Sequence, residues 1–396
     1  MADILIAGGG IGGLAAALGL AKRGHQVTVL ERRDVFTEVG AGIQLGPNAF
    51  HALDLLGVGR EVRERAVVID ALRFMDGTTG EQVTALPVTE KYRARFGNPY
   101  AVVHRVDLYL PLLEAARRHP GIRLLGRRHV VAYEQWAGGV TAVLADGGRV
   151  TGSALIGADG LHSAVRRQLV ADGPPRLSGH TIYRSVIPME EVPEELRGNS
   201  VVLWAGPKWH LVHYPITGGS HFNLAVTQDD GAAEALAGVP AEHDDVLSRF
   251  PGLPGPARRV LELGRDWKSW VLCDRDPVDR WTEGRVALLG DAAHPMLQYA
   301  AQGACQALED AVLLAVLLDG PEEDFVQRLE KYSAARRERT ARVQLVAREM
   351  GRVLYHAAGE ARVERNAMLA ALSDEDMYDK AAWLHGAYDF AWGDGN

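Results

Sequence analysis

The chain has 396 residues, 47% of them hydrophobic and 24% charged, with a formal net charge of −8 at pH 7. This is the composition of a globular protein long enough for two domains of ordinary size, and its acidic balance excludes nucleic acid as an expected partner. The two cysteines, Cys273 and Cys305, follow no disulfide or metal-ligand spacing, which favours a cytoplasmic protein without a metal site.

Residues 4–21, ILIAGGGIGGLAAALGLA, form an uncharged run long enough to resemble a membrane span or the core of a signal peptide. Six of these residues are glycine, which is a poor helix former. The run also follows Asp3 rather than a basic segment. We therefore expect a strand, a turn and a helix here, and no membrane partner.

The same run predicts the first unit of a dinucleotide-binding fold. Asp3–Ala7 is expected as a strand, 8–13 (GGGIGG) as a turn, Leu14–Arg23 as a helix and Gln26–Leu30 as a second strand, with Glu31 at its end. This is a βαβ unit with the fingerprint GxGxxG, in which phosphates lie on the N-terminus of the helix. The pattern leaves FAD and NAD open at this point.

Each part of the glycine turn has a physical reason. Gly8 permits the tight turn, Gly10 lets the backbone approach a pyrophosphate, and Gly13 lets the helix pack closely on the strand. Glu31 can accept hydrogen bonds from a ribose hydroxyl, so Arg32 beside it is expected at the surface or against an adenine rather than at a 2′-phosphate. The predicted contacts of this unit are Gly8, Gly10, Gly12, Gly13, Glu31 and Arg32.

Further strand–turn elements follow much later in the chain. Val150–Ile156 is predicted as a strand that leads into 157–166 (GADGLHSAVR), and Arg285–Leu289 as a strand that leads into 290–295 (GDAAHP). With the N-terminal unit, these elements indicate one sheet assembled from separated segments.

The fold class predicted from this organisation is α/β, a Rossmann-like cofactor-binding domain with an inserted β-rich substrate domain and C-terminal helices. We expect the cofactor-binding domain at 1–173 and 276–320, the substrate domain at 174–275 and the helical region at 321–396. In the helical region the basic cluster is expected as a solvated face. It consists of Arg336, Arg337, Arg339 and Arg342.

A hairpin is predicted in the inserted domain, because Trp209–Ile216 and His221–Thr227 flank a pair of glycines. This register places Tyr214 opposite Asn223. Side chains two apart share a face of a strand, so His210 and Tyr214 point the same way, toward a face that is mixed in polarity as a binding-site wall should be.

The motifs GGGIGG, GADGLHSAVR and LLGDAAHP together resemble the three fingerprints of the class A, single-component FAD-dependent aromatic hydroxylases, whose cofactor domain is of the GR2 type. The resemblance extends over nearly the whole chain. Within the family, the closest likeness is to the enzymes that hydroxylate 3-hydroxybenzoate, followed by those acting on salicylate and 6-hydroxynicotinate. The segments that carry this closer likeness are GAGIQLGPN (40–48), PYAVVHR (99–105), WHLVHYP (209–215), HPMLQY (294–299) and WLHGAYDF (383–390).

The resemblance implies FAD as cofactor, NADH or NADPH and O2 as co-substrates, a small aromatic substrate and a homodimer. The expected reaction is hydroxylation of a phenolic acid, 3-hydroxybenzoate to gentisate, through a flavin C4a-hydroperoxide. Another hydroxyarene such as salicylate, hydroxynicotinate or a biosynthetic phenol remains an alternative substrate. An FAD-dependent dehydrogenase or reductase is the alternative reaction.

The resemblance also assigns residues to the cofactor. Asp291 would accept hydrogen bonds from the ribityl hydroxyls, Arg105 would approach the phosphate or ribityl region, and His294 and Pro295 would shape the loop at the flavin ring. The cofactor residues expected outside the first unit are Gln44, Arg105, Asp159, Asp291 and Ala304.

Candidate catalytic residues are His210, Gln298 and Tyr214. His210, with an ordinary pKa near 6.5, is expected to accept the phenol proton. Gln298 would contact the same oxygen, and Tyr214 would hold the ring or its carboxylate. His213 is expected to be structural, and Gln302 to begin the next helix.

Overall fold

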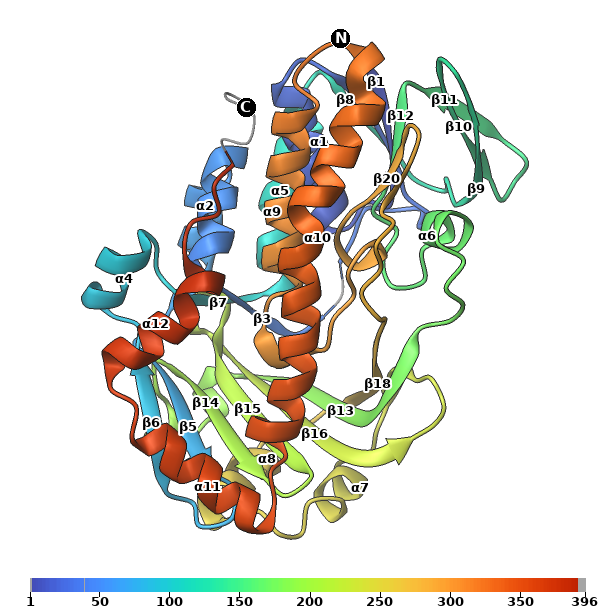
Figure 1. The fold of residues 1–396 in the computed structure, drawn as a ribbon. Helices are drawn as coiled ribbons and strands as arrows, with labels where there is room; N and C mark the ends of the chain where they lie inside the picture. The colour runs from blue at the N-terminus through green and yellow to red at the C-terminus, as the bar shows by residue number, and fades with distance from the viewer. Residues whose placement is uncertain (1, 39, 391–396) are drawn as a thin grey trace.

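The chain folds into an α/β part that contains the N-terminus and a large sheet that lies below it in the view of Figure 1. The computed structural model describes residues 2–38 and 40–390. The last residues of the predicted helical region, 391–396, lie outside the described residues.

A mostly parallel sheet forms the centre of the α/β part. Its order is β19-β20-β12-β1-β2-β8, and only β19 runs antiparallel to its neighbour. Helices cover this sheet, so its strands are short apolar runs buried on both faces. The bounds are β1 (Asp3–Ala7), β2 (Gln26–Leu30), β8 (Ile122–Leu125), β12 (Ala154–Gly157), β19 (Thr282–Glu283) and β20 (Val286–Leu288).

The register brings the predicted motifs to one edge of this sheet. Ala7 at the end of β1 pairs with Gly157 at the end of β12, and Gly157 pairs with Leu288 at the end of β20. The loops that follow these strands therefore lie side by side at the carboxyl edge, where open α/β sheets bind their ligands. The prediction of one sheet from separated segments is confirmed.

The single strand predicted over Val150–Ile156 is wrong, because the segment is divided between two sheets. β11 (Arg149–Gly152) belongs to an antiparallel sheet with β9 (Val130–Trp136) and β10 (Gly139–Leu144), whereas β12 belongs to the parallel sheet. A Cβ atom at Gly152 would lie 2.7 Å from the carbonyl oxygen of Asp3. The chain can therefore bend closely past β1 at this glycine, a tertiary contact that strand periodicity does not reveal.

The apolar N-terminal run is a strand and a helix, as predicted. Helix α1 (Ile11–Lys22) is buried on nearly all sides because it packs against α5 (Arg105–Arg118) and α9 (Gly303–Leu317). Gly19 lets α1 and α9 approach closely, since a Cβ there would lie 2.9 Å from the Cβ of Ala315. No helix among the described residues is long and apolar enough to cross a membrane.

The large sheet has the order β17-β18-β13-β16-β15-β14-β5-β6. It differs from the predicted insert because β5 and β6 come from the segment that we expected in the cofactor-binding domain. A parallel pairing of β14 with β5 joins the two stretches of chain. The bounds are β5 (Ala71–Asp76), β6 (Gln82–Pro87), β13 (Arg176–Pro188), β14 (Ser200–Gly206), β15 (Trp209–Ile216), β16 (His221–Ala232), β17 (Ala237–Pro240) and β18 (Lys268–Asp274).

The hairpin β15–β16 has the predicted register, with Tyr214 opposite Asn223 and Ile216 opposite His221. Its connection is longer than the expected glycine pair, because Thr217–Gly219 form a 3-10 turn followed by Ser220. The predicted two-residue loop and the observed four-residue loop give the same strand register. Adding one residue at each end of the loop removes the residue pair next to it and leaves all other pairs unchanged. Phe222 and Leu224 face the apolar core, as expected.

Helix α10 (Phe325–Glu349) extends alongside both parts of the molecule (Figure 1). The prediction that its arginines form a solvated face is wrong for Arg336, which is fully buried. Its guanidinium contacts Glu309 at 2.6 Å and Asp310 at 2.7 Å on α9, so the buried charge is paired on two sides. These carboxylates lie outside the predicted helical region, and the pattern of α10 alone does not reveal them.

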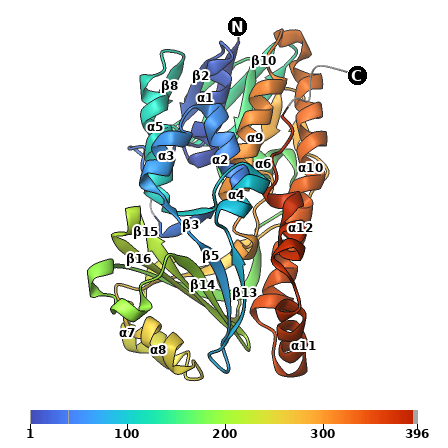
Figure 2. The same cartoon turned by 90° about the vertical axis from the view of Figure 1, so that its left-hand side faces the viewer.

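The other elements complete the layers. Figure 2 shows α11 and α12 beside the large sheet, and both contact β6. The remaining bounds are α2 (Pro47–Leu56), α3 (Gly59–Arg65), α4 (Glu90–Phe96), α6 (Ala164–Leu169), α7 (His243–Ser248), α8 (Gly255–Glu262), α11 (Gly359–Ala370), α12 (Asp374–His385), β3 (Gly42–Leu45), β4 (Val67–Val68) and β7 (Ala101–His104).

Candidate active site

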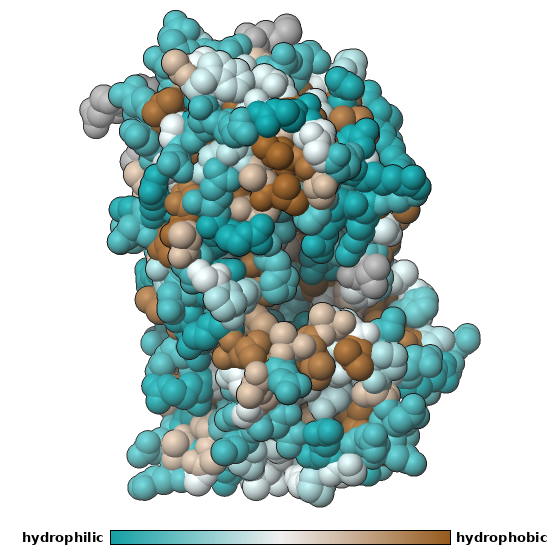
Figure 3. Space-filling model, turned by 90° about the vertical axis from the view of Figure 1, so that its right-hand side faces the viewer, coloured by the Kyte–Doolittle hydropathy of each residue, from teal (hydrophilic) through white to brown (hydrophobic). Residues whose placement is uncertain are grey.

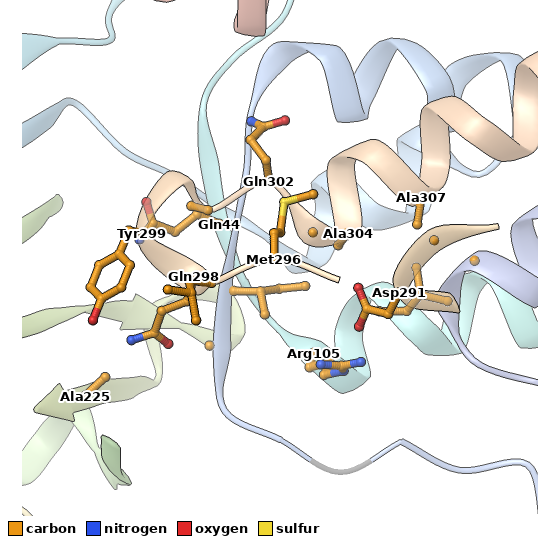
Figure 4. Close-up of a pocket in the computed structure, with 18 of the residues that line it drawn as sticks. Gln44, Arg105, Ala225, Asp291, Met296, Gln298, Tyr299, Gln302, Ala304 and Ala307 are labelled. Atoms are coloured by element: carbon orange, nitrogen blue, oxygen red, sulfur yellow. The ribbon is translucent and has the colours of Figure 1, made fainter. Parts of the chain in front are cut away.

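A cavity of about 340 Å³ lies where the carboxyl edge of the parallel sheet meets the large sheet. One end is lined by the glycine turn and Asp291, and the other by Gln298, Tyr299 and β15. Figure 4 shows Asp291 and Arg105 at one side of the view and Gln298 and Tyr299 at the other, near Ala225 of β16. In Figure 3, hydrophobic side chains gather above and below a hollow between the two parts of the molecule.

A smaller cavity of about 220 Å³ continues from it and is lined by Glu31 and Arg32. The residues that line both cavities are Gly10, Arg105, Ala158 and Gly160. The site is therefore elongated, and its two cavities meet at the glycine turn. An extended dinucleotide has this shape, with a nucleotide at one end and a reactive ring at the other.

The glycine turn has the geometry that the sequence predicts. Gly8 has φ of +104°, and a Cβ atom there would lie 2.3 Å from the carbonyl oxygen of Ala158. A Cβ at Gly13 would lie 2.0 Å from the carbonyl oxygen of Gly8. At Gly10 a Cβ would meet nothing within 4 Å, because this position faces the open cavity. Gly8 and Gly13 therefore allow the tight turn, and Gly10 leaves room for a ligand.

Glu31 braces the turn while it faces the smaller cavity. One carboxylate oxygen accepts a hydrogen bond of 2.8 Å from the backbone N–H of Gly9, and the other accepts one of 2.9 Å from the N–H of Arg33. Each carboxylate oxygen has a second lone pair, so Glu31 can still accept from a ribose hydroxyl.

Asp159 lines the smaller cavity, but its carboxylate also caps α6. It accepts hydrogen bonds from the Ser163 hydroxyl and from the backbone N–H groups of Ala164 and Val165, the latter two at 2.7 and 3.3 Å. Burial raises the pKa of Asp159, and these hydrogen bonds oppose the rise. The carboxylate thus holds the loop after β12 in shape.

The other predicted cofactor residues lie along the main cavity. Asp291 is exposed to it at the end of β20, and Ala304 lines it at the first turn of α9. Gln44 lines it from β3 and accepts a 2.7 Å hydrogen bond from the Tyr100 hydroxyl. Arg105, at the start of α5, has its Nε 3.1 Å from a carboxylate oxygen of Glu38.

The side chain of His294, which we expected to shape the loop at a flavin ring, points into the core. It is fully buried, and its Nε2 lies 2.6 Å from an Asp310 carboxylate oxygen. The same oxygen accepts a 3.0 Å hydrogen bond from the N–H of Gly290. Arg166, also buried, donates to the carbonyl oxygens of Ala292 and Ala293. His294 and Arg166 therefore hold the GDAAHP loop from behind.

The substrate end of the cavity is lined by one face of β15, as predicted. His210, Val212 and Tyr214 all line it. Tyr214 is buried, and its ring packs closely against Gly42 of β3. A Cβ atom at Gly42 would lie only 2.5 Å from the ring. His213, on the other face, accepts a 3.2 Å hydrogen bond from the indole N–H of Trp204, which fits the structural part expected for it.

Gln298 lines the same cavity as His210 and is held on two sides. Its Oε1 accepts a 2.6 Å hydrogen bond from Nη2 of Arg184, and its Nε2 donates to the Thr227 hydroxyl at 3.4 Å. Gln302 lies at the start of α9, as predicted. Its side-chain oxygen accepts a 3.0 Å hydrogen bond from Nδ2 of Asn48.

The pKa of His210 departs from the ordinary histidine value of 6.5. Burial lowers the pKa of His210 well below that value, and the neighbouring His356, His180 and Arg184 lower it further. Its Nδ1 lies 2.8 Å from Nε2 of His356. His210 is therefore neutral near pH 7 and is one member of a group of histidines rather than an isolated base.

Sequence reasoning missed several residues that line the substrate end. Arg184, Tyr299 and Tyr355 all face the cavity. The sequence did contain a signal for Arg184, because it is the single charged residue in the run IYRSVIP of β13. Tyr299 and Tyr355 offered no such signal, because aromatic residues beside helices are usually part of a core.

Comparison with known proteins identifies the family. Residues 1–347 match the family model described as FAD binding domain. The chain is 49% identical to 3-hydroxybenzoate 6-hydroxylase 1 of Aquipseudomonas alcaligenes, over 97% of each protein. It is 46% identical to the 3-hydroxybenzoate 6-hydroxylase of Polaromonas naphthalenivorans, over 99% of this chain and 96% of the relative. The chain belongs to the FAD-dependent aromatic hydroxylases.

Solved structures of similar proteins have the same fold. A salicylate hydroxylase in complex with its substrate superposes with a TM-score of 0.83 at 29% identity, over 98% of this chain and 96% of that chain. Klebsiella pneumoniae HpxO complexed with FAD and uric acid gives a TM-score of 0.85 at 26% identity, over 97% of both chains. The predicted fold class and the family resemblance are confirmed.

The cavities of this hydroxylase fit FAD, its cofactor, which works with NAD(P)H and O2 as co-substrates. The open space at Gly10 suits a pyrophosphate at the N-terminus of α1, where unpaired backbone N–H groups favour anions. The Asp291 carboxylate faces the main cavity at the end near the glycine turn, where the ribityl hydroxyls would lie. The N-terminus of α9 opens into the same cavity beside Ala304.

Proposed function

We propose that this flavoprotein hydroxylates 3-hydroxybenzoate at C6 and forms gentisate. The observation that carries the proposal is the composition of the substrate end, where His210, Gln298, Tyr214 and Arg184 line one buried cavity beside the GDAAHP loop. A phenol with a carboxylate on the same ring offers a partner to each of these groups. The high identity to enzymes named for this reaction supports the same substrate.

Arg184 binds the carboxylate of the substrate. Its guanidinium faces the cavity, and no carboxylate pairs with it in the described part of the chain. Burial lowers the pKa of Arg184, and Arg105 lowers it further, although an arginine remains charged near pH 7. A buried cation without an anion is costly, so the site favours an anionic ligand over a neutral one of the same shape.

His210 accepts the phenol proton on Nε2. That nitrogen has no hydrogen-bond partner among the described residues, whereas Nδ1 is held by His356. Gln298 orients the phenolic oxygen, because Arg184 and Thr227 fix its amide group. The Tyr214 hydroxyl, also without a protein partner in the described residues, holds the ring from the same strand face as His210.

FAD, when bound, reduced and combined with O2, supplies an electrophilic oxygen atom near the ring. The protein makes the substrate ring electron-rich by removing the phenol proton, and it keeps water away from the ring and the flavin. Tyr299, Tyr355 and Val212 supply apolar surface for that purpose. Gly10, Glu31, Arg105, Asp159 and Asp291 hold the cofactor along the two cavities.

The finer features of the prediction belong to the same proposal. We take NADH as the reductant, a homodimer as the working assembly and the cytoplasm as the compartment. Their support is the family resemblance and the absence of a disulfide between Cys273 and Cys305, which are both free. Paired rate measurements with NADH and NADPH test the reductant, and light scattering of the purified protein tests the dimer.

A substrate panel tests the proposed function. NADH oxidation and O2 consumption are measured with 3-hydroxybenzoate, salicylate, 6-hydroxynicotinate and 4-hydroxybenzoate. The proposal predicts the strongest coupled consumption with 3-hydroxybenzoate. Strong stimulation by salicylate alone would favour the alternative substrate. Oxidation of NADH that needs no aromatic compound and consumes no O2 would favour a reductase.

A further inference from the structure

A row of polar side chains connects His210, the buried base at the substrate end, with the surface of the protein. His210 is bonded to His356 by the contact of 2.8 Å between Nδ1 and Nε2. The ring of His356 lies 4.9 Å from the ring of His180, centroid to centroid. A ring nitrogen of His180, a ring nitrogen of His356 and a carboxylate oxygen of Asp229 all lie within 4.8 Å of one another. These residues come from β15, β13, β16 and the segment after η7 (Met350–Tyr355), so the fold alone assembles them.

Exposure increases along this chain of residues. His210 is 1% exposed and His356 is 9% exposed, whereas the side chains of His180 and Asp229 are 16% and 37% exposed. Asp229 lies opposite His180 in the pairing of β13 with β16, and the two side chains are 3.9 Å apart. The row therefore begins in the substrate cavity and ends at solvent.

We propose that His210, His356, His180 and Asp229 form a proton relay that carries the phenol proton from the substrate cavity to solvent. This inference rests on the proposed function, because it requires a substrate that loses a proton at His210. It adds His356 and Asp229 as transfer residues and His180 as the residue that positions Asp229, and none of the three lines the cavity.

The transfer balances as follows. The phenol O–H bond breaks and its proton bonds to Nε2 of His210, while the proton on Nδ1 of His210 passes to Nε2 of His356. His356 releases its own Nδ1 proton, through a bridging water, to the Asp229 carboxylate, which lies within 4.8 Å of one ring nitrogen of His356. The phenol becomes a phenolate, Asp229 gives its proton to solvent, and no charge stays on a buried histidine.

The environment of the histidines makes such a relay necessary. Burial and, to a smaller extent, the neighbouring His180 together lower the pKa of His356 to about 3. Burial also lowers the pKa of His180, whereas Asp229 and Asp230 raise it. A proton that reached His210 or His356 would therefore not remain there near pH 7, and it must pass outward or return to the phenolate.

Neighbouring groups hold the relay in place. The Tyr299 hydroxyl lies 2.5 Å from Nδ1 of His180, and this hydrogen bond fixes the orientation of the ring. The ring of Tyr355 packs edge-on against His210, with the ring centroids 4.9 Å apart. The Tyr355 hydroxyl donates to the carbonyl oxygen of Tyr299 at 3.0 Å. Arg184 is the remaining charged group that faces His210, and its positive charge opposes protonation there.

Proton release on substrate binding tests the relay without turnover. Oxidised, FAD-loaded enzyme is mixed with 3-hydroxybenzoate in weakly buffered solution with a pH indicator, and flavin absorbance reports binding separately. For His356→Gln, which keeps an acceptor for His210 but cannot pass a proton on, we expect release slowed by roughly 10- to 100-fold. The dissociation constant should be unchanged. Asp229→Asn should slow release less, and imidazole should restore it in His356→Ala.

His213→Gln is the matched control, since His213 is also buried and lies on the other face of β15. It should release the proton at the native rate. Native rates in His356→Gln, or equal slowing in His213→Gln, would overturn the relay while leaving the proposed function intact. Release that EDTA abolishes and Zn²⁺ restores would also overturn it and would make these side chains a metal site. Wild-type enzyme that neither binds nor hydroxylates 3-hydroxybenzoate would overturn both proposals.

Discussion

Nη2 of Arg184 donates a hydrogen bond of 2.6 Å to Oε1 of Gln298, which joins β13 of the large sheet to the loop after β20. One residue thus comes from the sheet that walls the proposed substrate end, and the other from the loop that begins at Asp291, the proposed ligand of the cofactor. The contact therefore joins the two proposed parts of the site. A guanidinium has five N–H donors, so this bond leaves others for a ligand.

Removal of the Arg184 charge should weaken binding of the acid. For Arg184→Met we expect KM for 3-hydroxybenzoate to rise about 10- to 100-fold, because a hydrogen bond to a charged group contributes roughly 1.5–3 kcal/mol. Steady-state kinetics measure this change, and Arg184→Lys should retain part of the affinity. The neutral analogue 3-hydroxybenzyl alcohol should lose little affinity. An equal loss for acid and alcohol would show that Arg184 acts through packing instead.

Loss of His210 should impair hydroxylation and spare the cofactor. For His210→Ala we expect the hydroxylation rate to fall by about 10²- to 10⁴-fold, the usual contribution of a positioned acid–base group. The flavin content of the purified variant, measured by absorbance, should equal that of the wild type, because His210 lies at the substrate end. A variant that hydroxylates at the native rate would remove His210 from the mechanism.

A side chain at Gly10 should affect the cofactor and not the fold. Gly10 has φ of −78°, which any residue adopts, and a Cβ there meets no protein atom within 4 Å. Gly10→Val should therefore unfold at the native temperature when both proteins are free of FAD, and bind FAD at least about tenfold more weakly. Gly255→Ala, also open and at the start of a helix, is the control and should bind FAD normally. Native affinity in Gly10→Val would place the pyrophosphate elsewhere.

The buried carboxylate of Asp310 should make the free energy of unfolding depend on pH in the acidic range. Burial raises the pKa of Asp310, but His294 and Arg336 outweigh it and lower the pKa to about 2 from an ordinary 3.8. A lowered pKa stabilises the fold above pH 4, and this contribution is lost as the pH falls through about 2. It amounts to roughly 2 kcal/mol. Urea unfolding of wild type and Asp310→Asn should show a stability difference that shrinks over that range. A constant difference would contradict the assignment.

The sequence predicted those parts of the molecule that depend on local patterns. The glycine turn, Glu31 at the end of β2 and the hairpin register all follow from spacing along a few residues, and the structure has them. The joint order of the three motifs predicted a common sheet. Alternation of side chains placed His210 and Tyr214 on one face of β15.

What the sequence did not reveal depends on contacts between distant segments. The histidine row needs β13, β15, β16 and the segment after α10 to converge, and of its members only His210 was predicted from the sequence. Burial of Arg336 depends on carboxylates of α9, and the lowered pKa of His210 depends on burial in the assembled fold. Local periodicity carries no information about such partners.

The most direct test of the account is the identity of the product. Wild-type enzyme is incubated with NADH, O2 and 3-hydroxybenzoate, and the aromatic product is identified by NMR. The account predicts gentisate, in which the new hydroxyl lies para to the first, formed in proportion to the NADH consumed. A product hydroxylated ortho to the existing hydroxyl would contradict the ring position, and NADH consumption without any hydroxylated product would contradict the central claim.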